Sequence, residues 1–148
     1  MGGDLGRANG HGWHEQPTPH QLTALVGQRV KLVCAGGITS CAVTEKGEFY
    51  TWGAGASGQL GHGDEEHQLT PKRVEGLNGV KVAAAAICDT HTVVADKDGV
   101  VWAFGDRMFL GLGGPDADPD SYPLVLEPAQ IPTLRVRALK SPDALPFR

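Results

Sequence analysis

Residues 53–58 are the first segment of this sequence that could bind a ligand. Their order, Gly-Ala-Gly-Ala-Ser-Gly, fits the G-x-G-x-x-G spacing of dinucleotide-binding loops. That chemistry also needs a helix directly afterwards, because the N–H groups at a helix N-terminus bind the pyrophosphate. The residues that follow, Gln-Leu-Gly-His-Gly-Asp, are turn-forming instead. A nucleotide-dependent enzyme that uses Gly53 to Gly58 is therefore the weakest function hypothesis, and a structural loop is the better interpretation.

Two other groups of residues could suggest a metal. Asp116, Asp118, Asp120 and Glu127 occupy four positions of a calcium loop, but Ser121 replaces the required glycine and no helix pattern flanks them. Five histidines stand among Gly, Pro and acidic residues without cysteine pairs at zinc spacing: His11, His14, His20, His62 and His67. We interpret both groups as solvated loops, and we expect neither a metal nor a cofactor.

The nucleophilic side chains also lack a catalytic pattern. Cys34, Cys41 and Cys88 are an odd number of cysteines inside apolar stretches, which favours buried, reduced thiols in an intracellular protein. His91 precedes a predicted strand, as Ser40 does earlier in the chain. We expect His91 to be a hydrogen-bonded structural residue rather than a catalytic base. No G-x-S-x-G nucleophile elbow occurs in the sequence. We therefore expect a non-catalytic protein.

Composition restricts the fold and the partners. Gly supplies 21 of the 148 residues, about twice ordinary usage, and with 10 Pro this disfavours a helical bundle and favours short strands joined by turns. The net charge of −4 argues against direct nucleic-acid binding. No run of 18 apolar residues exists to cross a membrane, and the first ten residues lack the apolar core of a secretory signal. We expect a cytoplasmic or nuclear location.

An internal repeat of about 52 residues organises the chain. The segment Glu-Phe-Tyr-Thr-Trp-Gly at residues 48–53 corresponds to Val-Val-Trp-Ala-Phe-Gly at residues 100–105. The same offset relates Gly47 to Gly99, Gly61 to Gly113, and Pro71 to Pro123. In each copy an apolar strand precedes a hairpin, with the strands expected near residues 30–35 and 80–87. Each copy therefore predicts a three- or four-stranded antiparallel sheet.

Sheets of this kind must stack on neighbours to bury both faces, as the blades of a β-propeller do. Even four blades of 52 residues would need about 208 residues, so this chain cannot close a ring alone. We predict an all-β fold of antiparallel four-stranded blades, an incomplete, open propeller. Its expected parts are a tail of a preceding blade (1–29), a first blade (30–79), a second, degenerate blade (80–133), and the start of a following repeat (134–148).

The first copy closely resembles the repeat of the regulator of chromosome condensation family. The resemblance rests on Trp52-Gly53, on Gly-Gln-Leu-Gly at residues 58–61, and on Leu-Thr-Pro-Lys-Arg-Val at residues 69–74. It implies a seven-bladed propeller, of which this chain holds about two repeats. The implied structural residues are Gly47, Trp52, Gly53, Gly58, Gly61, His91, Gly99, Phe104, Gly105 and Gly113.

Propeller loops offer a broad surface to a partner, so the leading hypothesis is a protein-interaction module. The candidate contacts are two aromatic residues outside the strand pattern, Trp13 and Phe109, and the acidic run Asp64, Glu65 and Glu66. The family resemblance implies one alternative, a part of a guanine-nucleotide exchange factor for a small GTPase. A further possible partner is a second copy of the chain that would help to complete the ring.

Overall fold

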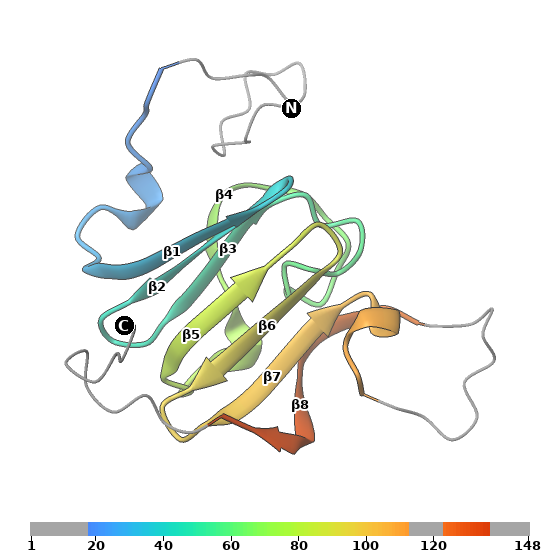
Figure 1. Cartoon of the computed structure of the whole chain (residues 1–148). Coiled ribbons are helices and arrows are strands. Elements are labelled where there is room, and N and C mark those ends of the chain that lie inside the picture. The colour runs from blue at the N-terminus through green and yellow to red at the C-terminus, as the bar shows by residue number, and fades with distance from the viewer. Residues whose placement is uncertain (1–17, 113–122, 137–148) are drawn as a thin grey trace, which may run out of the picture.

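The computed structural model describes residues 18–112 and 123–136 of the chain, and these form two four-stranded antiparallel sheets. Each sheet is a simple meander in which consecutive strands pair (Figure 1). Sheet 1 consists of β1 (Val30–Gly36), β2 (Thr39–Thr44), β3 (Phe49–Gly53) and β4 (Gln68–Arg73). Sheet 2 consists of β5 (Val82–Ile87), β6 (His91–Asp96), β7 (Val100–Gly105) and β8 (Val125–Arg135). The prediction of antiparallel four-stranded blades is confirmed.

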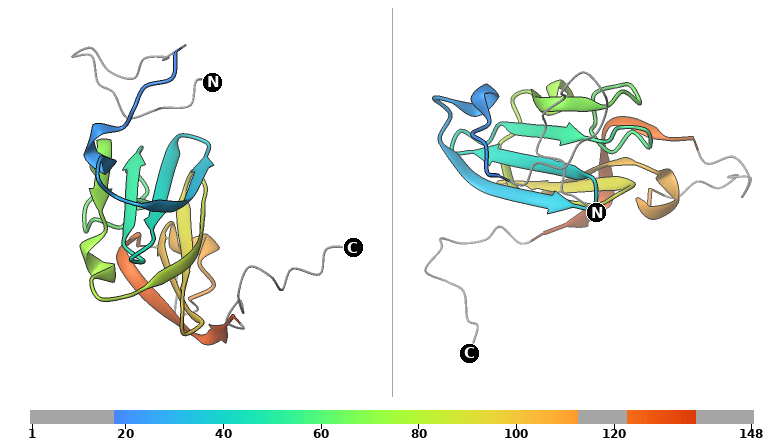
Figure 2. Two further views of the ribbon diagram at one scale, coloured as in Figure 1. Left: turned by 90° about the vertical axis from the view of Figure 1, so that its left-hand side faces the viewer. Right: turned by 90° about the horizontal axis from the view of Figure 1, so that it is seen from above.

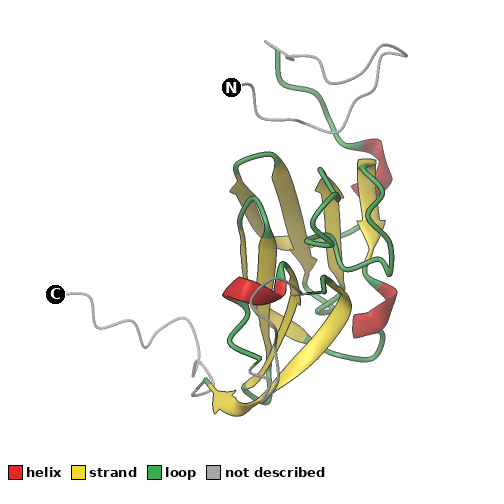
Figure 3. Cartoon of the chain, turned by 90° about the vertical axis from the view of Figure 1, so that its right-hand side faces the viewer, coloured by secondary structure: helices red, strands yellow, loops and turns green. Residues whose placement is uncertain are grey.

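The only helices in the described ranges are three short 3₁₀ turns, η1 (Thr23–Leu25), η2 (Glu75–Leu77) and η3 (Arg107–Phe109) (Figure 3). The described part of the predicted preceding blade, residues 18–29, contains η1 and no strand. A strand in this segment would need a neighbouring strand to pair with, because the backbone hydrogen bonds of a β-strand are made to adjacent strands and not within the strand itself.

The two sheets pack face to face around one apolar core, as the views of Figure 2 show. Sheet 1 contributes Cys41, Val43 and Phe49, and sheet 2 contributes Val94 and Phe104. The rings of Phe49 and Phe104 meet edge to face with centroids 6.5 Å apart, a favoured aromatic geometry. The alternation of strand side chains places these residues on one face of each sheet, so the pattern read from the sequence explains the packing.

Two glycines hold equivalent places at the ends of the third strands. A Cβ on Gly53 would run into the carbonyl oxygen of Ile38, and one on Gly105 would run into that of Thr90. Both residues have positive φ, 106° and 113°, which disfavours other residues. The sheets are therefore built alike at the level of backbone contacts.

The register of β8 corrects the repeat alignment. In sheet 1, Thr51 pairs with Lys72, and in sheet 2 the equivalent Ala103 pairs with Ala129, which is 57 residues after Lys72 rather than 52. The loop before the fourth strand is 14 residues long in sheet 1 and 19 in sheet 2. The structural equivalent of Pro71 is consequently Pro128, and the match with Pro123 was wrong. A five-residue insertion in a proline-rich segment produced that coincidence.

The same shift moves the end of the second sheet. β8 continues to Arg135, so Leu134 belongs to sheet 2 and not to the start of a following repeat. Leu134 is the equivalent of Leu77, which is 4% exposed between the sheets, whereas Leu134 is 46% exposed. The last strand of the second sheet therefore has an exposed apolar residue near its end, for which the described chain supplies no neighbouring sheet.

Candidate protein-interaction surface

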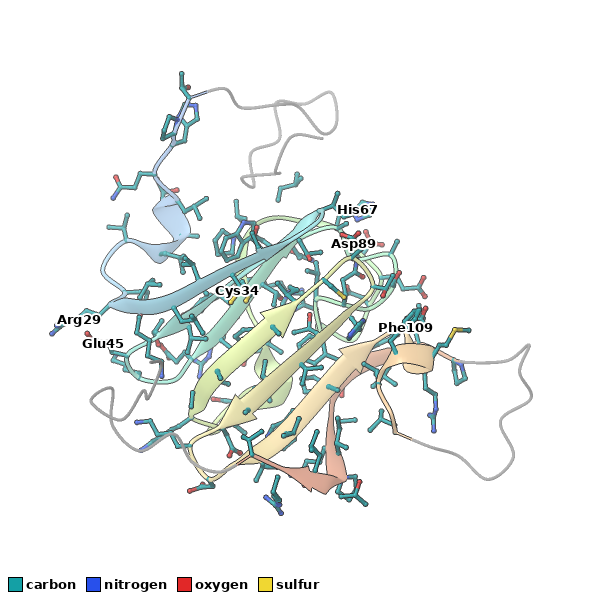
Figure 4. The ribbon with its side chains drawn as sticks, in the orientation of Figure 1. Arg29, Cys34, Glu45, His67, Asp89 and Phe109 are labelled. Atoms are coloured by element: carbon teal, nitrogen blue, oxygen red, sulfur yellow. The ribbon has the colours of Figure 1, made fainter. Side chains whose placement is uncertain are left out.

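Four connections gather at one end of the sheets, which we call the loop end. In a meander, alternate connections lie at the same end, so the turns after β1 and β5 lie with the longer loops after β3 and β7. His67, Asp89 and Phe109 lie there in Figure 4, and Arg29 and Glu45 lie at the opposite end. The loop end therefore contains Phe109 and the acidic run that the sequence singled out.

Phe109 is 55% exposed, and its neighbour Met108 is 60% exposed. Their loop is nevertheless anchored, because the Asp106 carboxylate accepts a hydrogen bond from the Met108 N–H at 3.0 Å and Leu110 is buried with Val101, Ala103 and Ile131 of sheet 2. The Phe109 ring also stacks on the His91 ring, with centroids 5.7 Å apart. Two large apolar side chains are thus held in solvent by a structured segment.

The acidic run is divided between structure and surface. The Asp64 carboxylate accepts a hydrogen bond from the Glu66 N–H at 3.1 Å and lies 3.9 Å from Lys72 Nζ, so Asp64 shapes its own loop. Glu65 and Glu66 are exposed. The Asp64 side chain is still 40% exposed, so all three acidic residues present charge at the loop end, and Asp64 is also tied into its own loop.

Sequence reasoning missed two other residues of the loop end. Asp89 is exposed, and its carboxylate accepts a hydrogen bond from the N–H of Ile38, which is 49% exposed. The turn that contains Asp89 leads to His91 and so to Phe109, which makes the surface continuous from sheet 1 to sheet 2. The aspartate between two apolar strands was a visible signal, but its contact with Ile38 depends on tertiary structure.

Gln59 joins the two sheets beneath this surface. Its side chain is 2% exposed, accepts a hydrogen bond from the Ser57 N–H at 2.8 Å and donates one to the Asp89 carbonyl at 2.9 Å. The Thr92 hydroxyl donates to the Gln59 carbonyl at 2.7 Å. The Gly-Gln-Leu-Gly segment therefore positions the loop end by linking a sheet 1 loop to sheet 2.

The glycine-rich loop at residues 53–58 does not have the form of a phosphate-binding site. No helix begins after Gly58, where the described chain makes turns, and the Gly58 N–H donates to the Gly55 carbonyl at 2.8 Å. A Cβ on Gly58 would lie 2.8 Å from a methyl carbon of Leu126. The loop is packed against sheet 2, which supports its interpretation as a structural element.

The cysteines differ from one another more than expected. Cys41 is buried. Burial strongly raises the pKa of the Cys41 thiol, and the nearby Cys34 thiol adds to this effect. Cys34 and Cys88 are only partly buried, so the prediction of three buried thiols was wrong for these two. All three are free thiols.

Most of the predicted structural residues lie within the described part of the chain. Gly47, Trp52, Gly61, Gly99 and Phe104 are all buried. His91 opens β6 and pairs with Gly105, as Thr39 pairs with Gly53, so its counterpart in the first copy is Thr39 and not Ser40. Trp13 and Gly113 lie outside the described residues, as do Asp116, Asp118 and Asp120.

The described residues contain no group of three or more His, Cys, Asp or Glu side chains that could hold a metal ion. A hollow of about 170 Å³ lies beside Arg29 and Glu45, and one of about 110 Å³ lies beside His62 and Glu127. Both are smaller than the roughly 300–1,000 Å³ of typical ligand pockets. Within the described ranges, no helix is long and apolar enough to pass through a membrane.

Comparison with known proteins identifies the repeat. Residues 46–95 match the family model of the regulator of chromosome condensation (RCC1) repeat. The E3 ubiquitin-protein ligase HERC2 of Homo sapiens is 44% identical over 102 residues, which are 66% of this chain and 2% of that protein. The matched residues run from the β2–β3 turn into β6, so the sequence repeat is offset from the sheets.

Solved structures show the same fold. Human WBSCR16 matches with a TM-score of 0.68 and 27% identity over 87% of this chain and 31% of that one. Prp20p of Saccharomyces cerevisiae matches with a TM-score of 0.62 and 22% identity over 76% of this chain and 28% of that one. This chain thus contains an RCC1 repeat within part of a β-propeller, and spans less than a third of each of these three proteins.

Proposed function

We propose that this chain is a non-catalytic protein-interaction module that binds its partner through the loop end. The observation that carries the proposal is the pair Met108 and Phe109, which are exposed on an anchored loop. A side chain already held in place loses less conformational entropy on binding, so it contributes more to affinity. Exposed aromatic residues of this kind are typical centres of protein interfaces.

The charges beside this pair suggest the chemistry of the partner. Glu65, Glu66 and Asp89 are exposed at the loop end, and the net charge of the chain is −4. A partner surface with an apolar pocket bordered by Lys or Arg would complement them. The solved structure of Prp20p is described with its binding to Gsp1p and histones, which supports a protein partner for this fold.

Binding to two defined probes tests the proposal: purified core histones, which are basic, and a small GTPase. We expect Phe109→Ser to weaken binding of the cognate probe by about tenfold or more, the effect of losing a central interface residue. Val26→Ser is the matched control, because Val26 is 62% exposed but precedes β1 on the side of Arg29. Equal losses from both substitutions, or binding of neither probe, would contradict the proposal.

Guanine-nucleotide exchange on the small GTPase is the alternative function, and the same proteins can be used to test it. An exchange factor must accelerate release of labelled GDP from the GTPase, whereas an interaction module binds without acceleration. Self-association is a further alternative, because Val33 of sheet 1 is 67% exposed and Leu134 of sheet 2 is 46% exposed. Light scattering detects it as an increase in mass. A mass that rises with concentration, and falls for Val33→Ser, would assign the partner as a second copy instead.

A further inference from the structure

Cys88 and His91 form a close thiol–imidazole pair at the turn between β5 and β6. Cys88 Sγ lies 3.1 Å from His91 Nδ1 and 3.3 Å from the His91 carbonyl oxygen. The Cys88 N–H also donates to that carbonyl at 3.0 Å, which fixes the backbone of the turn. Cys88 is a partly exposed residue, as is Cys34.

The pair is particular to the second sheet. The equivalent residues of the first sheet are Gly36 and Thr39, and a Cβ on Gly36 would run into the Ile87 carbonyl of sheet 2. The Thr39 hydroxyl donates to the Cys88 carbonyl at 3.0 Å and so helps to join the sheets. Within the described residues no third sheet packs on position 88 as sheet 2 packs on Gly36, and a thiol occupies the place where the first copy requires glycine.

The surroundings of His91 fix the orientation of its ring. Its imidazole stacks on Phe109 with an interplanar angle of 19°. The neighbouring Asp89 carboxylate faces the Ile38 N–H of sheet 1 at 3.2 Å, where it is already engaged. An imidazole nitrogen this close to a thiol can take its proton, which produces the nucleophilic thiolate.

The other two thiols lack this arrangement. The Cys34 thiol donates a hydrogen bond to the Ala85 carbonyl at 3.3 Å. Cys41 is buried beside it, and burial raises the pKa of its thiol. The chain thus contains two internal references against which the reactivity of Cys88 can be measured.

We propose that Cys88, with His91 as its base, is a thiol-modification site that reacts with low-molecular-weight disulfides such as oxidised glutathione. In the tautomer with Nδ1 unprotonated, His91 accepts the Cys88 proton, and the thiolate attacks one sulfur of the disulfide. The disulfide bond of the reagent breaks as the bond to Cys88 forms. The departing thiolate then takes the proton from His91, so one thiol and one disulfide are exchanged without another oxidant. The proposal does not depend on whether the loop end binds a partner.

The test uses the full chain with oxidised glutathione at pH 7, with intact mass and peptide mapping to give a rate for each cysteine. We expect native Cys88 to react about tenfold faster than Cys34, with Cys41 slowest, and the three rates to converge in denaturant. We expect His91→Gln to remove most of the advantage of Cys88, and Cys34→Ser to leave the Cys88 rate unchanged.

Two results would overturn the proposal. One is a native Cys34 rate equal to or above that of Cys88, which needs no variant and so does not depend on whether a substitution folds. The other is an unchanged Cys88 rate in a His91→Gln protein whose circular dichroism matches the wild type.

Discussion

At the scale of single residues, the candidate contacts separate into exposed and structural groups. Phe109 could be predicted because it stands outside the strand pattern, and it is exposed as expected. Met108 beside it gave no separate signal, since an isolated methionine fits a core as well as a surface. Asp64 appeared equivalent to Glu65 in the sequence, yet its side chain is used within its own loop, and only backbone geometry decides this.

Gly61 should be among the least replaceable glycines. A Cβ there would lie 2.7 Å from the ring of Phe104, which is fully buried and cannot move aside. We expect Gly61→Ala to lower the free energy of unfolding by about 2–4 kcal/mol, from overpacking added to the strain of positive φ. Gly79→Ala is the matched control, because Gly79 has a similar φ of 82° and nothing within 4 Å of its Cβ position.

For this control we expect a loss of about 1 kcal/mol, from the backbone conformation alone. Chemical denaturation of both variants measures the difference. Equal losses would show that the contact between Gly61 and Phe104 is unimportant for stability.

His62 should make stability depend on pH. Burial, and secondarily Lys72, lower the pKa of its imidazole to about 4, while the unfolded chain binds that proton near pH 6.5. The fold is therefore destabilised as the pH falls from 6.5 toward 4. We expect a loss of about 1–2 kcal/mol from this group, because solvent screening of the partly exposed ring reduces the full effect.

Unfolding at pH 7, 5.5 and 4.5 measures this dependence. His62→Gln should flatten the curve in this window, and His20→Gln, at an exposed histidine, should not. An unchanged pH dependence in His62→Gln would reject the assignment to His62.

At the scale of the elements, the hairpins were predictable and the last strand was not. Turn glycines and alternating apolar residues defined β2, β3, β6 and β7, because these strands lie next to each other in sequence. β8 follows a loop of 19 residues, and a proline at the expected offset concealed the insertion. Only the pairing of Ala103 with Ala129 reveals the true register.

Gln59 provides the element-scale test, because it connects a loop of sheet 1 to a turn of sheet 2. Gln59→Ala removes two hydrogen bonds and a buried side chain, and we expect it to lower the free energy of unfolding by about 2–3 kcal/mol. Gln130→Ala, at an exposed glutamine of β8, should change it by less than about 0.5 kcal/mol. Urea denaturation measures both free energies of unfolding. Similar losses in the two variants would contradict the role of Gln59 in joining the two sheets.

At the scale of the whole molecule, the described sheets share one core and should unfold together. Phe49 of sheet 1 contacts Phe104 of sheet 2, so neither sheet keeps its apolar face covered when the other is lost. Trp52 reports on sheet 1 and Trp102 on sheet 2. In a Trp13→Phe background, we expect Trp52→Phe and Trp102→Phe proteins each to show one transition by fluorescence that coincides with its transition by circular dichroism.

Two separated midpoints within either protein would show that the sheets are independent units. The comparison is made within each variant because the substitutions themselves change stability. The incomplete propeller was predictable at this scale from repeat length alone, whereas the contacts that close the two sheets on each other required coordinates.

The offset between the sequence repeat and the sheets limits how such a protein can be divided. Residues 46–95 begin in the middle of one hairpin and end inside the next sheet, so an excised repeat would hold two strands from each. Sheet 1 would lose β1 and β2, and sheet 2 would lose β7 and β8. The Phe49 ring would therefore lose its contact with Phe104 and become solvent-exposed. The unit that repeats in the sequence and the unit that forms a sheet are thus different pieces of the same chain, so one sequence repeat links two successive sheets.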